Sequence, residues 1–375
     1  MLLGQERGNI EALLALKEQG CEVLCLIRNE EWITRIPEAL ESQGIAWRKV
    51  PFLSAWRHGS SLSELVRNAI IFIRANIMFL YLVRQFRPTH LHVFNQINVL
   101  TFIVALSLVR IPVVYRAGDK PTLHHWAWRT VWRFIRWRTS RFVAVSRFIA
   151  DCLAESGIER ERIDIIYNRP PTRRLGSSSP PVLPETCDTW MIYVGQLIPE
   201  KGVDVAVEAF RRLARDYPRL GFFIVGRISE WDGDRWARGL QTEVMSYTEI
   251  ADRVVFTGEV EDVGAMFRKA RVHLVPSVWQ EPSGNVVLEA KLAGVPSVVF
   301  PTGGLPEFIK DGVDGTVCSA ASAEALADAI VPYLDDPGRA HREGEAARNS
   351  LDCLGNRNFG QDWLAALTRT DRAKG

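Results

Sequence analysis

Acidic residues are almost absent from one long stretch of this sequence. Residues 42–150 contain 16 Lys and Arg, and their only acidic residues are Glu64 and Asp119. Residues 1–168 carry 22 basic and 15 acidic side chains, whereas residues 169–375 carry 24 and 29. The charge split indicates that the first half of the chain faces an acidic partner or surface.

Cysteine pairs at metal-binding or redox spacing are also missing. The six cysteines, at positions 21, 25, 152, 187, 318 and 353, form no Cys-x-x-Cys motif, which favours reduced thiols in a cytoplasmic protein. No secretory leader is evident, because the chain runs from Met1 almost directly into Gly4 and a polar helix. We expect no membrane span, because Arg74 and Arg84 interrupt the most apolar region, residues 69–83.

Strand-like and helix-like segments alternate along both halves of the chain. Apolar runs predict strands at residues 22–27, 46–50, 90–94, 112–115, 141–145, 163–167 and 190–194. Helical spacing predicts helices at residues 11–19, 61–86, 99–109, 124–138, 146–156 and 203–215. This alternation predicts an α/β protein whose parallel sheets are covered on both faces.

A proline-rich break separates the two halves. Residues 168–189 hold five prolines and little apolar content, which is typical of a boundary between domains. We predict an N-terminal domain over residues 1–170 and a Pro/Ser-rich linker over 171–189. A second domain is expected over 190–350, followed by a C-terminal helix within 351–375.

Two glutamates eight residues apart, Glu281 and Glu289, are the most informative pair in the sequence. Glu281 follows an apolar strand at 272–275, and Glu289 is expected about two turns into the helix that begins after Gly284. The start of that helix suits an anion such as a diphosphate. One carboxylate can then bind sugar hydroxyls and the other a ribose, although a helix cap and a solvated glutamate would give the same spacing.

Three other motifs, one before the glutamate pair and two after it, make this interpretation more specific. Residues 193–204 read Tyr-Val-Gly-Gln-Leu-Ile-Pro-Glu-Lys-Gly-Val-Asp, residues 293–309 begin Ala-Gly-Val-Pro, and residues 311–315 read Asp-Gly-Val-Asp-Gly. Together with the glutamate pair, they resemble the nucleotide-sugar half of the retaining glycosyltransferase family 4, the glycosyl transferases group 1. The resemblance is strong over residues 193–317 and weaker over residues 20–170.

The resemblance implies the GT-B fold, with two Rossmann-like domains whose parallel sheets face each other across a cleft. It also implies that the C-terminal helix crosses back to the first domain. Relatives usually open with a strand before a glycine-rich loop. Because Met1 stands almost at the loop, we expect either that this N-terminal strand is missing or that the start codon is misplaced. Its absence is expected to leave neighbouring strands without a hydrogen-bonding partner.

The resemblance also assigns a donor site. Lys201 and Glu281 match the catalytic positions. The nucleotide-sugar positions are Gly195, Gln196, Lys201, Glu281, Gly284, Asn285, Val286 and Glu289. Relatives usually place an arginine where Gln196 stands, so one phosphate-binding cation is lost. His, Asp and Glu do not gather at ligand spacing, and we expect no cofactor and no metal, with Lys201 neutralising the diphosphate instead.

Acceptor-side candidates in the first half are fewer. Gly4, Asn95 and Asp119 are the positions expected near the acceptor or the donor sugar, and Gly118 stands where many relatives have a histidine. A loop cap is an equal alternative for Asp119. The histidines His92, His124 and His125 are more typical of packed side chains than of catalytic ones.

A basic aromatic helix is predicted near the middle of the first half. Residues 126–141 contain four Trp and five Arg without an acidic residue. We predict a membrane-facing surface made of Trp128, Arg129, Trp132, Arg133 and Arg136. A solvated basic face and a nucleic-acid patch are the alternatives, and no nucleic-acid reading module is visible.

These patterns lead to one functional hypothesis and one alternative. The hypothesis is a retaining hexosyltransferase that uses a UDP- or GDP-sugar and a saccharide or lipid-linked acceptor in lipopolysaccharide, envelope or exopolysaccharide synthesis. It predicts a cytoplasmic protein in peripheral contact with the inner face of an anionic membrane, with no nucleic-acid partner. The alternative is a nucleotide-sugar-binding scaffold at the membrane with little or no turnover, which Gln196, Gly118 and the short N-terminus favour.

Overall fold

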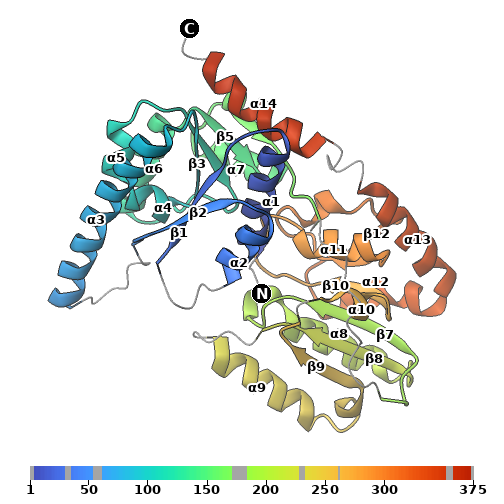
Figure 1. Ribbon diagram of the computed structural model, residues 1–375. Helices are drawn as coiled ribbons and strands as arrows, with labels where there is room; N and C mark the ends of the chain where they lie inside the picture. The colour runs from blue at the N-terminus through green and yellow to red at the C-terminus, as the bar shows by residue number, and fades with distance from the viewer. Residues whose placement is uncertain are drawn as a thin grey trace. The chain divides into compact units, whose positions relative to one another are not determined.

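The computed structural model describes residues 4–29, 35–53, 61–170, 184–227, 233–260, 262–351 and 358–372. The chain forms two compact units (Figure 1). The first comprises residues 169–357, and we call it the donor unit. The second comprises residues 2–168 and 358–375, and we call it the basic unit. Most of the predicted linker, residues 171–183, lies outside the described residues.

The donor unit contains a six-stranded parallel sheet in the order β12-β11-β10-β7-β8-β9. Its strands are β7 (Thr189–Val194), β8 (Leu220–Val225), β9 (Val254–Gly258), β10 (Ala270–Val275), β11 (Ser297–Val299) and β12 (Gly315–Val317). Its α-helices are α8 (Val203–Ala214), α9 (Gly233–Ser246), α10 (Gly264–Phe267), α11 (Asn285–Ala293), α12 (Ala323–Asp335) and α13 (Pro337–Ser350).

Helices cover both faces of this sheet because its central strands are apolar on both sides. Met191 and Tyr193 of β7 pack with α8 and α12, whereas Trp190 and Ile192 pack with α10 and α11. Trp190 also stacks on Phe223 with ring centroids 4.3 Å apart. The continuous apolar strands are those that a doubly covered parallel sheet requires.

The described strands of the basic unit form two sheets. Strands β1 (Leu24–Arg28) and β2 (Ala46–Val50) make one parallel pair. Strands β3 (Leu91–Phe94), β4 (Val113–Ala117), β5 (Arg141–Ala144) and β6 (Ile163–Ile165) make a parallel sheet in chain order. The α-helices are α1 (Gly4–Glu18), α2 (Arg35–Ser42), α3 (Leu62–Phe86), α4 (Gln96–Thr101), α5 (Ile103–Leu108), α6 (Trp126–Arg138), α7 (Arg147–Glu155) and α14 (Phe359–Arg372).

The single helix predicted over residues 99–109 is wrong, because the structure divides it at Phe102 into α4 and α5. The cause is Asn76 of α3, which inserts its side-chain amide into the turn. Its Nδ2 donates to the Thr101 carbonyl at 2.8 Å, and its Oδ1 accepts from the Ala105 N–H at 2.8 Å. A side chain that takes over backbone hydrogen bonds interrupts a helix.

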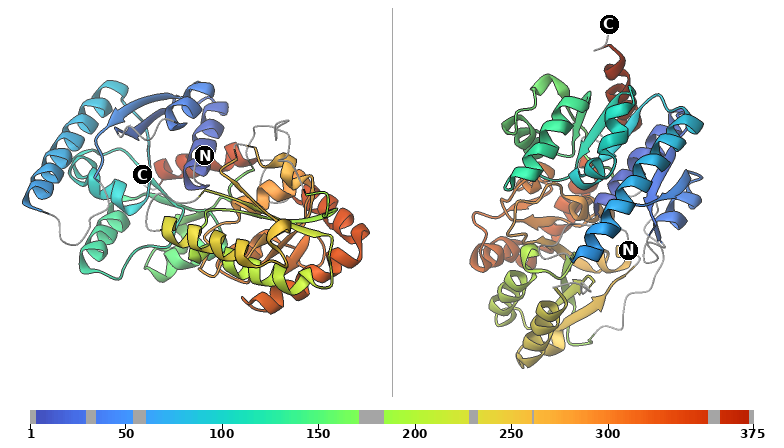
Figure 2. Two further views of the ribbon diagram at one scale, coloured as in Figure 1. Left: turned by 90° about the horizontal axis from the view of Figure 1, so that it is seen from below. Right: turned by 90° about the vertical axis from the view of Figure 1, so that its left-hand side faces the viewer.

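Helix α14 brings the end of the chain back onto the basic unit. Trp363 and Leu367 pack with Ala12 and Leu16 of α1 over one face of the β3–β6 sheet, where α1 and α14 lie side by side (Figures 1 and 2).

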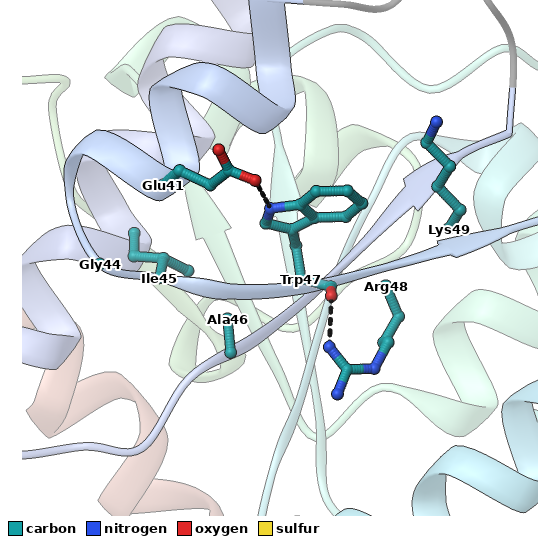
Figure 3. A pocket seen from close by; sticks show the side chains of 7 residues that line it. All are labelled: Glu41, Gly44, Ile45, Ala46, Trp47, Arg48 and Lys49. Atoms are coloured by element: carbon teal, nitrogen blue, oxygen red, sulfur yellow. Dashed lines mark hydrogen bonds between the residues drawn. The ribbon is translucent and has the colours of Figure 1, made fainter.

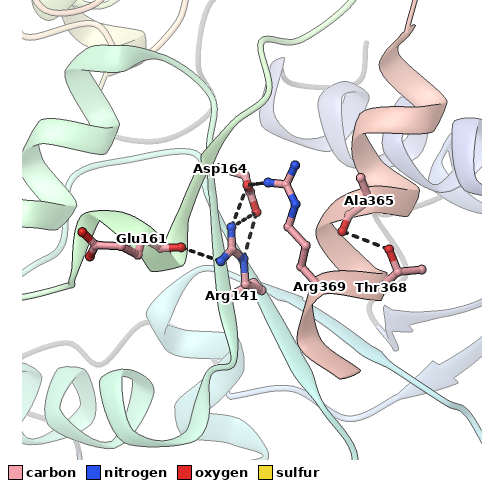
Figure 4. A network of polar contacts seen from close by, with 6 residues as sticks. All are labelled: Arg141, Glu161, Asp164, Ala365, Thr368 and Arg369. Carbon is pink, nitrogen blue, oxygen red and sulfur yellow. Dashed lines mark hydrogen bonds and ion pairs between the residues drawn. The ribbon is translucent and has the colours of Figure 1, made fainter. Parts of the chain in front are cut away.

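An ion-pair network holds the far end of α14. Asp164 accepts from Arg141 at 2.7 Å and from Arg369 at 2.5 Å (Figure 4). This network joins α14 to β5 and β6, so the last helix is part of the basic unit's structure.

Helix α3 requires a correction to the expectation about membrane spans. Among the described residues, it is long and apolar enough to cross a membrane by length and composition, even with Arg74 inside it and Arg84 near its end. Only 22% of the 18-residue apolar segment within this helix is buried. The helix continues through both arginines because their charged ends remain at the surface.

Candidate active site

Lys201 ends the short turn between β7 and α8. Tyr193 of β7 donates its hydroxyl hydrogen to the Gln196 carbonyl at 2.8 Å, which fixes the start of the turn. Gly202, the residue that follows the turn, has φ at 65°. A Cβ at Gly202 would lie 1.9 Å from the Pro276 carbonyl oxygen, so only glycine allows the two backbones to approach this closely.

The loop after β10 carries Glu281, and two neighbouring segments hold it. The Glu200 carbonyl accepts from the Val278 N–H at 3.0 Å. From the other side, the Glu281 carbonyl accepts from the Gly304 N–H at 2.7 Å. A Cβ at Gly303, where φ is 58°, would lie 2.3 Å from the same Glu281 carbonyl oxygen. The Thr302–Gly304 turn therefore supports the glutamate through its backbone.

Lys201 and Glu281, which are 80 residues apart in sequence, form an ion pair. The Lys201 Nζ donates to both carboxylate oxygens of Glu281, at 2.7 and 2.8 Å. The indole N–H of Trp279 donates to the same carboxylate at 2.6 Å, and the ammonium lies 5.3 Å from the centroid of that indole ring. The two side chains are 21% and 14% exposed, so the pair is accessible to a ligand.

The second glutamate lies in the helix that follows. Glu289 is buried on α11, four residues after Asn285, and thus about one turn from the helix start. The helix begins after Gly284 as expected, but the expectation of about two turns is wrong, because four residues span only about one turn. Gly284 is the N-cap and supplies no side-chain cap, while the Ser283 hydroxyl donates to the Asn285 Oδ1 at 3.2 Å.

Tyr193 was not predicted as part of the site. Burial and the nearby Glu281 carboxylate raise the pKa of Tyr193 well above its ordinary value, so it remains a neutral hydrogen-bond donor to the turn. Trp279 and Gly303 were not assigned to the site either, although Trp279 stands two residues before Glu281 and Gly303 lies within residues 293–309. Their contacts with Glu281 become evident only in the folded structure.

The structure brings the predicted donor residues of the donor unit into two adjoining segments. Gly195, Gln196 and Lys201 lie on the turn after β7, and the residues from Glu281 to Glu289 lie on the loop and helix after β10. β7 and β10 are neighbours in the sheet, so both segments leave the sheet at the same edge. Val286 belongs to α11, where it packs partly buried against the core.

The acceptor-side candidates lie in the basic unit. Gly4 is the first residue of α1, and the next residue, Gln5, donates to Asp119 at 3.2 Å. Asn95 follows β3 with φ at 66°, a strained value for a non-glycine residue, and its side chain caps α4 by accepting from the Ile97 N–H at 3.0 Å. Thus Asp119 and the start of α1 meet, and Asn95 has a structural role as a cap.

The proposed membrane surface on α6 needs a partial correction. Arg129, Arg133 and Arg136 are exposed, as predicted. Trp132 is only 3% exposed, and Trp128 packs partly buried against the same core, since both lie on the helix face that covers the sheet. The exposed tryptophans of α6 are Trp126 and Trp137.

The histidines also divide into two groups. His92 is packed, and burial lowers its pKa to about 3, with the Arg116 charge as a second cause. The packed assignment of His124 and His125 is wrong, because both are exposed, and the His125 Nδ1 accepts from the Ala127 N–H at the start of α6.

Metal-ligating groups are few in the part of the chain that the structure describes. No group of three or more His, Cys, Asp and Glu there could hold a metal ion. The sequence does contain one Asp-x-Asp triplet, Asp232-Gly233-Asp234, at the start of α9. Asp232 and the side chain of Asp234 lie outside the described residues, so the triplet must be tested by experiment.

The basic unit also contains a surface hollow, and none of the predicted site residues lines it. Glu41, Trp47 and neighbouring residues of α2 and β2 line it (Figure 3). Its polar groups bond to one another: the Trp47 indole donates to Glu41 at 3.2 Å, and Arg48 donates to the Trp47 carbonyl at 2.8 Å. We assign no ligand to this hollow.

Sequence comparison identifies relatives of both units. Residues 181–350 match the family described as Glycosyl transferases group 1, and residues 4–169 match the Glycosyl transferase 4-like domain. The chain is 33% identical over 189 residues to a glycogen synthase of Mycobacterium tuberculosis, covering 50% of this chain and 42% of that protein.

Other curated relatives act on lipid-linked or lipopolysaccharide substrates according to their names. One is a GDP-mannose-dependent alpha-(1-6)-phosphatidylinositol monomannoside mannosyltransferase of Mycolicibacterium smegmatis, 33% identical over 167 residues and covering 42% of each chain. Another is the lipopolysaccharide core biosynthesis mannosyltransferase LpcC of Rhizobium leguminosarum bv. viciae, 31% identical over 153 residues, 41% of this chain and 43% of that one. The matched segment spans less than half the length of each relative.

Solved structures share the whole architecture. Anabaena Alr3699/HepE in complex with UDP and glucose has a TM-score of 0.77 at 19% identity, covering 98% of this chain and 96% of that one. The sucrose-phosphate synthase of Thermosynechococcus elongatus has the same TM-score at 20% identity, covering 100% and 94%. With both units matched by family models and the fold matched over the full chain, this protein belongs to the group 1 glycosyl transferases and has the GT-B fold.

Proposed function

We propose that this glycosyltransferase moves a hexose from a UDP- or GDP-sugar to a saccharide or lipid-linked acceptor in lipopolysaccharide, envelope or exopolysaccharide synthesis. The observation that carries the proposal is the Lys201–Glu281 pair beside α11, which also carries Glu289. The names of relatives agree with this choice of donor, since one uses GDP-mannose and one solved neighbour was crystallised with UDP and glucose.

The proposed chemistry proceeds with retention and without a metal. The acceptor oxygen forms a bond to the anomeric carbon as the bond from that carbon to the diphosphate breaks, and a diphosphate oxygen takes the acceptor proton. Lys201 neutralises the leaving diphosphate, and the N–H groups at the start of α11 assist it. Glu281 then turns from Lys201 to the sugar hydroxyls, and Glu289 binds the ribose.

The proposed partners follow from the charge distribution. The basic unit contains the stretch of 16 Lys and Arg with two acidic residues, which suits an anionic membrane or an acidic acceptor. We therefore propose a cytoplasmic enzyme in peripheral contact with a membrane that holds its acceptor.

A second candidate is a nucleotide-sugar-binding scaffold that does not turn over. Gln196 brings no positive charge where relatives usually have an arginine, and loss of one charge-assisted contact costs about 1.5–3 kcal/mol. The scaffold and the enzyme would bind the same donor. Only the enzyme would release free nucleoside diphosphate and a glycosylated product.

A donor panel tests the proposal. Thermal unfolding should shift upward with one of the UDP-, GDP- or ADP-sugars, and calorimetry should then show that Glu289→Ala weakens both that donor and the free nucleoside diphosphate. Glu345→Ala, an exposed helix glutamate on α13, is the matched control and should bind normally. Unchanged nucleotide binding in Glu289→Ala would refute the ribose assignment.

Two further measurements test the mechanism. NMR of the product should show the donor's anomeric configuration. Turnover should persist in EDTA, and a strict need for Mg²⁺ or Mn²⁺ would contradict the metal-free proposal and direct attention to Asp232 and Asp234.

A further inference from the structure

Helix α3 exposes an unusual apolar stripe. Leu62, Val66, Ile70, Ile73, Ile77 and Tyr81 are between 51% and 77% exposed. They follow one another at intervals of three or four residues, so they lie on one face of the helix. The stripe is about 30 Å long at 1.5 Å per residue. Large exposed apolar patches mark interaction surfaces in soluble proteins.

The opposite face of α3 is firmly attached to the basic unit. Ala75, Phe79 and Leu82 are buried in its core, and the Phe79 and Phe102 rings lie 5.0 Å apart. Asn76 adds its hydrogen bonds to the Thr101 carbonyl and the Ala105 N–H. These contacts fix the rotation of the helix, so that the exposed apolar stripe on its opposite face points away from the core. Helix α3 lies at the outer edge of the basic unit (Figure 1).

The charged side chains of α3 are basic, apart from Glu64 in its first turn. Arg67 and Arg74 are exposed along one side of it, and Arg84 is exposed near its C-terminal end. No acidic residue occurs between Glu64 and Asp119. Helix α5, which packs against α3, adds the exposed apolar residue Leu108. The surface is therefore apolar along its middle and positive at its border.

We infer that α3 lies in the interface of an anionic lipid membrane, with the stripe inserted among the acyl chains and the arginines on the headgroup phosphates. The inference rests on the proposed membrane contact and assigns that contact to α3 rather than to α6. A helix in this position buries its apolar face about 5–10 Å into the boundary between headgroups and acyl chains. Long arginine side chains reach the headgroups from such a depth.

Two other arrangements of α3 fit the observations less well. A membrane-spanning α3 would have to leave its core contacts and carry Arg67 and Arg74 into the hydrocarbon, which is costly. A second copy of the chain docked on the stripe around a two-fold axis would place positive borders against each other, with no acidic residue on α3 after Glu64 to balance them.

Vesicle flotation of the full-length protein tests the inference. The wild type should float with vesicles of phosphatidylcholine containing phosphatidylglycerol and much less with phosphatidylcholine alone. The triple variant Ile70→Ser/Ile73→Ser/Ile77→Ser keeps the charge and should reduce the partition coefficient by about tenfold or more, because three inserted side chains are lost. Met245→Ser/Val313→Ser removes two exposed apolar side chains from the donor unit and should float like the wild type.

Flotation at high salt and flotation of arginine variants distinguish insertion of apolar side chains from purely electrostatic binding. Part of the wild-type binding should survive in about 1 M salt, where the Debye length is about 3 Å. Complete release at high salt would overturn the inference. Flotation of the serine variant equal to that of the wild type would overturn it too, and loss of flotation in Arg129→Gln/Arg133→Gln/Arg136→Gln would then assign the contact to α6.

Control measurements separate membrane insertion from self-association and from misfolding of the variant. Light scattering should give a monomer for the wild type, and a dimer that the serine variant abolishes would show a self-interface instead. Calorimetry with UDP and GDP should give equal nucleotide binding for the serine variant and the wild type, which shows that the variant is folded. If neither protein binds nucleotide while the flotation difference holds, the proposed donor fails and the assignment of α3 stands.

Discussion

The two units share one architecture but position their candidate residues differently. In the donor unit, glycines bring backbone against backbone: Gly202 against Pro276, and Gly303 against Glu281. In the basic unit, the candidate Asp119 accepts a 3.2 Å hydrogen bond from the side chain of Gln5, the residue after Gly4. The comparison indicates that the donor unit offers a site of fixed geometry, whereas Asp119 of the basic unit can change with little effect on the fold.

The largest effect is expected at Gly202. Gly202→Ala forces a Cβ against the Pro276 carbonyl at a positive φ, and should destabilise the donor unit by about 3 kcal/mol or more. Gly258→Ala is the control: φ is 68° and no atom lies within 4 Å of its Cβ, so it should cost only about 1–2 kcal/mol. Urea unfolding measures both, and equal losses would show that the close approach is unimportant.

A substitution in the candidate site of the donor unit should lower turnover more than a substitution at a candidate position of the basic unit. Lys201→Met removes the cation proposed to stabilise the leaving diphosphate and should lower kcat by about a hundredfold or more. Asp119→Asn keeps its size and lies on an exposed loop of the basic unit, so it should lower kcat by less than about tenfold. Initial rates at saturating donor distinguish them, and a milder loss for Lys201→Met than for Asp119→Asn would reverse the comparison.

Each unit contains a histidine whose pKa is lowered by its packed environment, and acid should destabilise both units. Burial lowers the pKa of His273 and of His92 to about 3 from the ordinary 6.5. Between these values the unfolded chain binds a proton that the folded chain does not, so stability is complete above pH 6.5 and is lost as pH falls below it.

The acid loss at pH 5 is about 2 kcal/mol for a fully buried histidine. His273 is 0% exposed and should show the full effect, whereas His92 keeps part of its surface exposed and should show less. Urea unfolding at pH 7.5 and pH 5 should give a smaller difference for His273→Asn than for the wild type. An equally steep loss would mean that another group controls acid unfolding.

The smallest effect is expected at Gln196. Gln196→Arg adds a cation to the turn that carries Lys201 and should raise kcat several-fold, about 1 kcal/mol of additional transition-state stabilisation. Gln196→Leu removes the amide without adding charge and should not raise it. A Gln196→Arg variant with wild-type turnover would show that Lys201 and the helix start already neutralise the diphosphate.

Most of the fold follows from local sequence patterns. The strand at residues 46–50 agrees with β2, and the apolar and polar spacing of residues 61–86 closely matches α3. Long periodic segments are well predicted because the residues that form them also define the buried face. The break at Phe102 could not be predicted, because its cause is Asn76, which lies 25 residues from the Thr101 carbonyl that it binds.

The candidate site shows the same limit. Lys201 and Glu281 were each identified by the motif around them, but their ion pair connects residues 80 apart. Trp279 donates to Glu281 from only two residues away, yet its orientation depends on the whole loop. Patterns in sequence identify which chemical groups a site contains, whereas their contacts depend on the packing of the sheet edge.

The Lys201–Glu281 pair has a consequence for selectivity. Each side chain of the pair already has a counterion at 2.7 Å, so an incoming anion must displace a carboxylate to reach the ammonium. A simple anion such as inorganic phosphate gains Lys201 but leaves Glu281 without its partner. The proposed nucleotide sugar would compensate both, because its diphosphate would replace the carboxylate and its hydroxyls would occupy Glu281. On the proposed donor assignment, the site would therefore discriminate against the abundant small anions of a cell by exchange of ion partners.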